Sequence, residues 1–539
     1  MSGTIQLLIL LMAVLAVVGV AARRLNTPPA ILLVVVGAAL ALTPGLPAME
    51  LAPEVVLLLV LPPVIYWSAV AMSWREFRFN LRPISFLAIG CVIFSALAVA
   101  AATHWLLGLP LLIGFVIGAI VSPPDAVAPL SIARRMHIPH RILVVLEGEG
   151  LANDATALIL YRFAVAAVSV GTFSFGQAVG TFAMIVVGEI VWGVGVGWGM
   201  LRIRQWVEDP SIEITLSLIT PFLAYWPPEY LGGSGVLATV TTGLYVSWNG
   251  PNLISAATRL QGIFFGAFIM YLIEGMIFLI TGLQARSLAA SLHGYSAFDL
   301  ASTAIVVCLV LIAARFIWVY PTVYLPRWLV PAIRRADPAP SWQGPFVLSF
   351  TGVRGIVSLA AALAIPFTIA NGAPFPDRDL ILFVTFAVIL VTLVVQGLLL
   401  PIVIRALKLA DEGRREREHD RREEQAARRE AATAALERLD RLAREEKLSD
   451  ELVGPIRAAY RERLRHIENR SSGDERHRKL TERHEEIAAQ LIAAERERIN
   501  ELYRADKLID EARRRIEREL DLREAQLANR DAEAPDVGV

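Results

Sequence analysis

The sequence predicts an all-α polytopic membrane protein with about thirteen transmembrane helices, followed by a charged helical tail. Three observations predict this class. Most of the chain carries few charges, apolar runs recur there at membrane-spanning length, and the connecting loops alternate in positive charge. Of all 539 residues, 55% are hydrophobic and 19% are charged, but these averages combine two very different regions.

Charged residues are distributed unevenly along the chain. Residues 411–539 contain 30 Lys/Arg and 34 Asp/Glu, which leaves 21 basic and 17 acidic side chains for the first 410 residues. A soluble domain has roughly a quarter of its residues charged, so the first 410 residues lack the polar surface that water requires. This excludes an ordinary soluble enzyme and predicts a membrane domain, 1–410, and a tail domain, 411–539. A formal net charge of zero argues against a nucleic-acid partner.

Apolar runs in the first 410 residues give the number of spans. Roughly 20 helical residues cross the hydrocarbon core of a bilayer, which makes the lipid bilayer the solvent of this region. Thirteen runs are found, at residues 4–22, 28–43, 53–72, 84–107, 110–132, 140–168, 177–201, 212–226, 231–248, 259–282, 298–326, 344–369 and 380–407. No basic residue precedes the first run and Arg23 and Arg24 follow it, so we expect a retained helix and not a signal peptide.

Positive charge in the loops gives an orientation, because short cytoplasmic loops hold an excess of Lys and Arg. With the N-terminus outside, the inside loops and the flank of the last span hold sixteen such residues, and the outside loops hold only Arg286 and Arg378. An odd number of spans then places the tail in the cytoplasm. We therefore expect a multi-pass membrane protein with its N-terminus outside.

The tail is predicted to form long helices. Glu, Arg and Ala dominate it, and apolar residues recur near the heptad spacing of a coiled coil. These positions are Ile487, Leu491, Ile499, Leu502, Ile509, Ile516 and Leu520. A capping box at residues 472–475 predicts a break between helices near Ser471. Two interpretations stay open: solvated helices joined by Glu–Arg pairs, or a segment for self-association or regulation.

The fifth apolar run predicts an interrupted helix. Its middle reads Ser122-Pro123-Pro124-Asp125, and two adjacent prolines remove two N–H donors and forbid a continuous helix. The half-helix that follows such a break presents unpaired N–H groups, which attract a carboxylate such as Asp125. The alternative is a simple proline kink with Asp125 as its N-cap.

The sixth run holds three carboxylates within eight residues, Glu147, Glu149 and Asp154. Helical spacing puts Glu147 and Asp154 on one face, and Glu149 and Asn153 on a neighbouring one. Glu147 lies near the predicted cytoplasmic boundary, where a boundary role is as plausible as chemistry, whereas Asp154 lies mid-span. A mid-span carboxylate without an obligate partner suits a group that alternately binds a proton and a metal cation, since hard cations prefer oxygen ligands.

Three further ionisable residues lie within apolar runs: Glu274, Arg315 and Arg354. Gly352 and Gly355 flank Arg354, which predicts a second interrupted helix in the run 344–369. Arg354 suits the carbonyl-rich ends of broken helices, as a carboxylate suits their N–H-rich ends. Arg315 is expected to supply compensating charge, and Glu274 is a candidate counter-ion.

The interrupted runs are the fifth and the twelfth, and they cross the membrane in opposite directions. Spans 1–6 and 8–13 then form two six-helix units of opposite orientation, each with a broken fifth member, and span 7 links them. Such inverted repeats are typical of secondary transporters, whose ion site lies at the midplane between the broken helices.

Nothing in the sequence indicates enzyme or cofactor chemistry. Cys91 and Cys308 each lie in an apolar run, so neither a disulfide framework nor a metal cluster is expected. No P-loop of the form GxxxxGK[ST] is present, which argues against ATP coupling within this chain.

Taken together, these motifs resemble the sodium/proton exchanger branch of the monovalent cation:proton antiporters, of bacterial type, over about residues 1–410. The residues that carry the resemblance are Asp125, the Glu149 to Asp154 segment with its Asn-Asp pair, Ala-Arg-Phe around Arg315 and Gly-Val-Arg-Gly around Arg354. The resemblance implies exchange of Na⁺, or of K⁺ or Li⁺, for H⁺ without a cofactor, in the service of pH homeostasis. It also implies a homodimer and an elevator-like movement of a core domain.

The same resemblance implies roles for individual residues. Asp154 matches the essential aspartate and Asn153 its preceding asparagine, which marks electroneutral exchange. Glu149 matches a glutamate that pairs with the arginine at Arg315. Asp125 matches the aspartate of the unwound helix, and the arginine that follows paired glycines matches Arg354.

Two departures from the family pattern bear on the choice of cation. Relatives often have Thr before the unwound-helix aspartate and Ser after the glutamate, whereas this chain has Pro124 and Gly150. Carboxylates, backbone carbonyls, water and Ser122 then remain as ion ligands.

Our hypothesis is that Asp154 alternates between a protonated and a cation-bound form, with Na⁺ or K⁺ as the transported metal ion. One alternative is K⁺/H⁺ exchange, which salt substitution in a pH-dye assay would discriminate. A second, from a different class, is a membrane scaffold or sensor that acts through its tail, which deletion of residues 411–539 would discriminate. An ion channel fits less well, because a buried carboxylate that must release protons suits slow alternating access.

Overall fold

The structure is a computed structural model, and it describes residues 2–25, 27–43, 52–170, 175–207, 209–286, 288, 295–471 and 475–531. The chain divides into two compact units, Met1–Arg414 and Arg415–Val539. We call the first the membrane unit and the second the tail unit, and each is described by itself.

Helices make up almost all of the described chain, which contains no strand and one isolated antiparallel bridge, between Thr368 and Pro374. The first half of the membrane unit has α1 (Ser2–Arg24), α2 (Pro29–Ala41), η1 (Val55–Val60), α3 (Leu61–Ala71), α4 (Trp74–Phe79), α5 (Leu81–Ser85), η2 (Phe86–Cys91), α6 (Val92–Leu107), α7 (Leu111–Val121), α8 (Val127–Arg135), α9 (His140–Val170) and α10 (Phe175–Arg204). Its second half has α11 (Pro210–Tyr230), α12 (Val236–Asn249), η3 (Gly250–Asn252), α13 (Ala256–Leu283), α15 (Ala297–Leu329), α16 (Pro331–Ala336), α17 (Gln343–Phe350), α18 (Ile356–Leu363), α19 (Arg378–Val391), η4 (Thr392–Gln396) and α20 (Gly397–Ala406).

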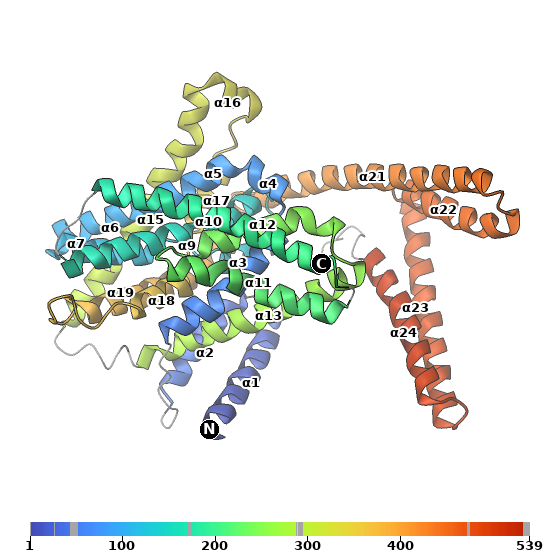
Figure 1. The fold of residues 1–539 in the computed structure, drawn as a ribbon, viewed down its shortest axis with the longest axis horizontal. Helices are drawn as coiled ribbons and strands as arrows, with labels where there is room; N and C mark the ends of the chain where they lie inside the picture. The colour runs from blue at the N-terminus through green and yellow to red at the C-terminus, as the bar shows by residue number, and fades with distance from the viewer. Residues whose placement is uncertain are drawn as a thin grey trace. The chain divides into compact units, whose positions relative to one another are not determined.

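Each of the thirteen predicted spans coincides with one helix or with a short series of helices, which confirms the all-α polytopic fold. Seven helices in the described residues are long and apolar enough to cross a membrane, and three more are apolar but shorter. In Figure 1 the long helices α9 and α10 run in roughly the same direction across the view. The run at 212–226 is short by hydropathy, yet α11 is longer because the Asp209 side chain caps it and it continues through Pro227 and Pro228.

Both predicted interruptions are present. The fifth span is divided into α7 and α8, and the twelfth into α17 and α18. Pro123 and Pro124 explain the first break, since neither residue can donate the N–H that a continuous helix needs. Residues 351–355 form the second break, where the backbone is not helical.

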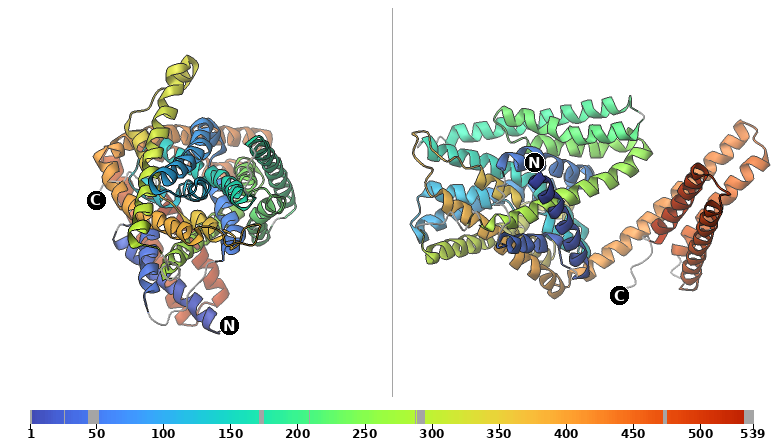
Figure 2. Two further views of the ribbon diagram at one scale, coloured as in Figure 1. Left: turned by 90° about the vertical axis from the view of Figure 1, so that its left-hand side faces the viewer. Right: turned by 90° about the horizontal axis from the view of Figure 1, so that it is seen from below.

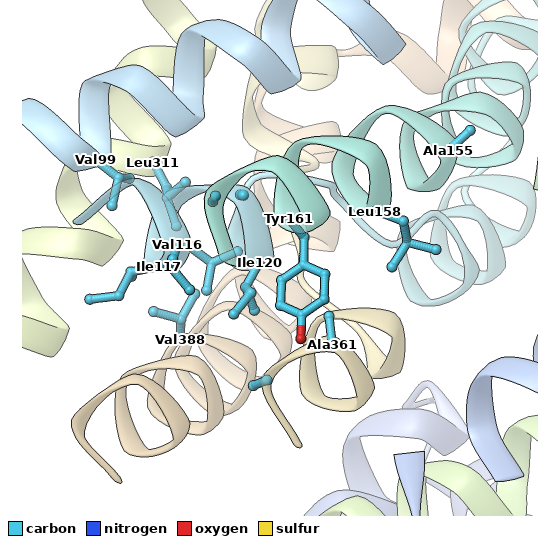
Figure 3. Close-up of a cluster of buried hydrophobic side chains, with 14 of the residues drawn as sticks. Val99, Val116, Ile117, Ile120, Ala155, Leu158, Tyr161, Leu311, Ala361 and Val388 are labelled. Atoms are coloured by element: carbon cyan, nitrogen blue, oxygen red, sulfur yellow. The ribbon is translucent and has the colours of Figure 1, made fainter. Parts of the chain in front are cut away.

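Apolar packing holds the broken helices within one bundle. Figure 3 shows Ile117 and Ile120 of α7, Leu158 and Tyr161 of α9 and Val388 of α19 converging in one buried cluster. Tyr161 is 9% exposed and the other four are 5% exposed or less. Since burying such a side chain is worth roughly 1.5–3 kcal/mol, this cluster fixes the helices that carry the candidate site.

A second group of helices packs through small residues. A Cβ atom at Gly37 of α2 would lie 2.3 Å from the carbonyl oxygen of Leu279, and one at Gly282 of α13 would lie 2.3 Å from that of Val34. The backbones of α2 and α13 therefore touch, a contact typical of membrane helices, where close approach replaces the hydrophobic effect.

The tail unit consists of helices, as its composition predicts. They are the main part of α21 (Leu409–Glu445), α22 (Asp450–Ser471), α23 (Glu475–Arg504) and α24 (Asp510–Asp531). Helices α23 and α24 lie side by side in Figures 1 and 2, bridged by Arg496 with Asp521 and Glu524. Of the predicted heptad positions, Leu520 is buried but Leu491 is 60% exposed. The predicted capping box spans residues 472–475. Three of these residues, 472–474, lie outside the described part of the chain.

Candidate ion-binding site

The candidate site is built where the two broken spans cross. The backbone N–H of Asp125 donates to the carbonyl oxygen of Val353 at 2.7 Å, which joins the break of span 5 to the break of span 12. Backbone groups that a continuous helix would have satisfied internally are thus satisfied by the opposite break. The two interruptions stabilise each other, and this explains why non-helical backbone is tolerated at membrane depth.

Asp125 lies at the N-terminal ends of two half-helices. Its carboxylate accepts a hydrogen bond from the backbone N–H of Val127 at 2.9 Å, in the first turn of α8. It also abuts Gly355, just before α18, where a Cβ atom would lie 1.9 Å from Oδ2 of Asp125. The positive ends of both helix dipoles therefore face one carboxylate. Only glycine fits at position 355 in this arrangement.

Arg354 lies at the opposite, carbonyl-rich ends. Its Nε donates to the carbonyl oxygen of Val121, the last residue of α7, at 2.7 Å, and its Nη1 donates to the carbonyl oxygen of Gly352. Its backbone N–H donates to the hydroxyl of Thr392 at 3.0 Å. The side chain is 2% exposed. A buried cation is thus matched to the negative ends of two half-helices, α7 and α17.

Glu149 and Arg315 form a buried, bidentate ion pair. Nη1 and Nη2 of Arg315 donate to the two carboxylate oxygens of Glu149 at 2.5 and 2.7 Å. Nε of Arg315 donates to the carbonyl oxygen of Leu348 in α17 at 3.0 Å. Both charged side chains are 2% exposed. The pair therefore connects α9, α15 and the first half of the broken span 12.

Two residues of α9 fit closely against the first break. The side-chain amide of Asn153 donates to the carbonyl oxygen of Pro124 at 2.6 Å. Its Oδ1 is buried and has no hydrogen-bond partner among the described residues. A Cβ atom at Gly150 would lie 2.6 Å from Cβ of Ala126. Glycine at position 150 thus allows a close approach that a serine side chain would hinder.

Asp154 lines a cavity. The cavity has a volume of about 860 Å³, and Asp125, Asp154 and Glu274 contribute to its wall. The same cavity extends to Arg134 and Arg259, which belong to segments predicted to be cytoplasmic. Asp154 forms no hydrogen bond or ion pair within the described residues, in contrast to Glu149 five residues earlier. An unpaired carboxylate in a cavity of this kind is available to an exchangeable ligand.

The predicted site residues do not all face this cavity. Glu274 on α13 contributes to its wall, opposite the broken helices, but Ser122 and Asn153 do not. The Ser122 hydroxyl is buried and donates to the carbonyl oxygen of Ala119 at 3.4 Å. The structure therefore brings together four carboxylates, Glu147 among them, and the two breaks, while the side chains of Ser122 and Asn153 bond to the helix ends.

Sequence analysis missed some residues that the structure places near the site. Ser358 is 2% exposed and lines the cavity, one turn into α18; its position three residues after Gly355 is the signal that could have indicated it. Glu229 of α11 binds Arg162 of α9. No local pattern connects those two residues, because they lie 67 positions apart.

Outside the membrane spans, Asp337 forms ion pairs with three arginines. Its carboxylate accepts hydrogen bonds from Arg82 at 2.6 Å, Arg141 at 2.7 Å and Arg327 at 2.7 Å. Burial alone would raise the pKa of Asp337, but the hydrogen bond from Arg141 and the three guanidinium charges outweigh it, so that the pKa lies below its usual value of 3.8. This cluster fastens the loop after α16 to α5 and α9.

Comparison with known proteins agrees with this architecture. Residues 9–406 match the sodium/hydrogen exchanger family, transmembrane region. An uncharacterised Na⁺/H⁺ exchanger of Mycobacterium tuberculosis is 35% identical over 527 residues, covering 96% of this chain and 95% of that protein. A sodium, potassium, lithium and rubidium/H⁺ antiporter of Bacillus subtilis is 32% identical over 366 residues, covering 66% of this chain and 54% of that protein.

Among solved structures, the sodium proton antiporter MjNhaP1 of Methanocaldococcus jannaschii has the same fold. It matches with a TM-score of 0.61 and 19% identity, and the match covers 75% of this chain and 98% of that chain. The family match spans nearly all of the membrane unit, including both broken helices and the residues that join them. The chain belongs to the sodium/hydrogen exchanger family.

Proposed function

We propose that the protein is a secondary antiporter that exchanges Na⁺ for H⁺, one for one, through competition of the two ions for Asp154. The observation that carries this proposal is the contrast between two carboxylates of α9. Asp154 lines the cavity without a hydrogen-bond or ion-pair partner among the described residues, whereas Glu149 is paired with Arg315. A carboxylate holds either a proton or a cation in such a place. Binding one ion therefore releases the other, and this competition couples opposite fluxes.

Other charged groups keep the site in shape in this proposal. Asp125 and Arg354 compensate the ends of the broken helices, and the pair of Glu149 and Arg315 fastens the core. Asn153 fixes α9 to the first break through the carbonyl oxygen of Pro124. Glu274 faces the same cavity from another helix and acts as a second negative charge that favours cations over anions.

Alternating access completes the mechanism. The cavity connects Asp154 with the side of Arg134 and Arg259, which the loop charges predict to be cytoplasmic. The proposed protein lies in a bacterial cell membrane with its N-terminus outside and its tail inside, as a homodimer. Residues 1–410 form the antiporter domain and residues 411–539 the cytoplasmic tail, and a movement of the broken helices against their neighbours opens the site to the other side.

The experiment that tests this proposal measures cation-driven dequenching of a pH dye in everted vesicles. Wild-type protein is expected to respond to NaCl, and Asp154→Asn is expected to give no response above empty vesicles. Asp299→Asn is the matched control, because it removes an exposed carboxylate at the start of α15, outside the cavity. Exchange at wild-type level by Asp154→Asn would end the proposal.

K⁺/H⁺ exchange is a second candidate. A relative named as a sodium, potassium, lithium and rubidium/H⁺ antiporter favours a broad cation choice. Pro124 and Gly150 also contribute no side-chain hydroxyl to the ion site. Replacing NaCl by KCl or LiCl in the same assay decides between these substrates.

A further inference from the structure

Arg162, in the C-terminal part of α9, joins this helix by polar contacts to the segment between α11 and α12. Nη1 of Arg162 donates to the carbonyl oxygen of Gly233, and Nη2 donates to the carboxylate of Glu229. The Arg162 and Glu229 side chains are 34% and 21% exposed. Arg162 thus holds a charged acceptor and a backbone acceptor at once, both at the turn between α11 and α12.

The two sides of this contact belong to different groups of helices. Helix α9 packs mainly against α7, η2, α5, α6 and α8, which carry or surround the broken span 5, and it also contacts α12 and α3. Helix α11 packs against α10, α12, α3 and α13. The Arg162 contact therefore lies, like the packing of α9 on α12 and α3, at the boundary between the helices around span 5 and a second group formed by α3 and α10–α13.

The acceptor turn is itself held in place by a buried carboxylate. Glu189 of α10 is 3% exposed, and its oxygens accept the backbone N–H groups of Ser234 at 2.7 Å and Leu237 at 3.0 Å. They also accept the N–H groups of Gly235 and Ala238. A remote carboxylate thus caps the N-terminus of α12, where it also meets the positive end of the helix dipole. This cap fixes the turn that presents Gly233 to Arg162.

The contact lies on the side of Asp154 that the cavity does not reach. Arg162 follows Asp154 by eight residues, which is about 12 Å along a helix. None of Arg162, Glu229 and Gly233 lines the cavity, whereas Arg134 and Arg259 at its other end do. The cavity thus extends toward the C-terminal end of α8 and the N-terminal end of α13. On the other side of Asp154, Arg162 bonds α9 to the segment between α11 and α12.

We propose that Arg162, Glu229 and the Gly233 carbonyl form a lock that holds the outer side closed while Asp154 is accessible from the cytoplasm. The inference rests on the proposed alternating access, because only such a cycle requires the two helix groups to separate there. The lock must open before Asp154 is reached from outside. It thereby sets the equilibrium between the two states without binding the transported ion.

The first test measures access from outside. In a background with Cys91→Ala and Cys308→Ala, Leu158→Cys places a thiol one turn from Asp154 toward Arg162. Whole cells are treated with a membrane-impermeant sulfonated thiol reagent. Glu229→Gln is expected to raise the labelling rate about tenfold, because a lost charge-assisted hydrogen bond shifts a two-state equilibrium by roughly that factor. The charge swap Arg162→Glu with Glu229→Arg is expected to lower it again.

The second test fastens the lock covalently. Arg162→Cys with Glu229→Cys in the same background is cross-linked with a short bifunctional thiol reagent that a reductant cleaves. Exchange is expected to stop on cross-linking and to return after reduction. Trp192→Cys with Leu223→Cys is the control, because this contact lies between α10 and α11 of one helix group. Cross-linking the control pair is expected to leave exchange unchanged.

The two tests separate the lock from the antiport itself. Labelling of Leu158→Cys needs no transport, so it reports on the lock even in a protein that moves no ions. Equal labelling with and without Glu229→Gln, together with full exchange by the cross-linked pair, would overturn the lock and leave the proposed function standing. Absence of exchange in the uncross-linked wild type would instead count against the proposed function.

Discussion

Two carboxylates five residues apart on α9 show two ways of keeping an acid inside a membrane protein. Glu149 receives two hydrogen bonds from Arg315 and is almost completely buried. Asp154 lines a cavity and receives no hydrogen bond from the part of the chain that the structure describes. A complete partner set fixes a charge in place and makes it part of the fold. A carboxylate with an incomplete set of partners can still bind a ligand. We therefore expect loss of Glu149 to damage folding, and loss of Asp154 to damage transport alone.

The largest loss of stability is expected when one partner of the buried pair of Glu149 and Arg315 is removed. Glu149→Gln is expected to destabilise the protein by about 3–5 kcal/mol, because it leaves the Arg315 guanidinium buried without a counter-charge. The measurement is the yield and melting temperature of detergent-solubilised protein, followed by fluorescence-detected size exclusion. Glu147→Gln is the control, because its partner Arg134 is 59% exposed and an exposed pair is worth only about 0–1 kcal/mol.

A double variant distinguishes lost charge pairing from lost packing. Glu149→Met with Arg315→Met replaces the pair by apolar side chains, which is often neutral for buried pairs. Recovery of folded protein relative to Glu149→Gln is expected. A wild-type melting temperature for Glu149→Gln itself would contradict the structural role of the pair.

The crossing of the broken helices predicts the next largest effect. Gly355→Ala would place its methyl group 1.9 Å from Oδ2 of Asp125, so Asp125 or the second break must move. We expect at least tenfold slower exchange in the pH-dye assay, since small displacements at a site cost about that much or more. Gly344→Ala in the same span is the control, because its nearest neighbour would be an ordinary 3.6 Å from the new methyl group. Equal exchange by both variants would show that the crossing tolerates displacement.

Asp337 offers a paired carboxylate outside the membrane, and there a smaller, pH-dependent effect is expected. Its pKa is lowered below 3.8 in the folded protein, so its stabilisation is present above that pH and is lost as the pH falls through the folded pKa. Asp337→Asn is expected to lower the melting temperature by a few degrees at pH 7. The difference from wild type should stay constant down to about pH 4 and narrow only below it. A difference that already narrows between pH 7 and pH 5 would contradict the low pKa.

Removing the tail is expected to have the smallest effect on exchange. Truncation after Arg414 keeps Gly413, whose Cβ position lies 2.0 Å from the carbonyl oxygen of His137, and therefore keeps the packing of the membrane unit. Vesicles with the truncated protein should still exchange Na⁺ for H⁺. Complete loss of exchange in a well-folded truncation would favour the alternative in which the tail carries the function.

Much of the fold could be predicted from the sequence because the bilayer imposes strong rules. A span needs about 20 apolar residues, and two prolines or a Gly-Val-Arg-Gly segment at its middle cannot continue a helix. These features alone indicated thirteen spans and the two interruptions. The π-helical segments η1, η2 and η4 could not be predicted in this way, because a single inserted residue in a helix leaves no apolar period of its own.

The candidate site was predictable only in part, for a geometric reason. Charged residues at membrane depth stand out in an apolar sequence, so Asp125, Asp154 and Arg354 could be found without a structure. The direction of a side chain depends on how its helix packs. Ser122 was expected among the ion ligands, but its hydroxyl bonds back to its own helix, as serine often does.

Contacts across long sequence separations were beyond prediction. Glu189 and Glu229 resemble other carboxylates in apolar segments, and only the tertiary arrangement brings them to the turn at Gly233. Their partners are backbone groups or a residue on a distant helix, which no spacing rule connects.

The central claim is that Asp154 holds a proton or a metal ion, and never both. Its most direct test is to count protons released when Na⁺ is added to purified, lightly buffered protein in detergent. The account predicts close to one proton released per bound Na⁺ for the wild type, and no release for Asp154→Asn. Saturable Na⁺ binding by the wild type with no release of protons at any pH would contradict it.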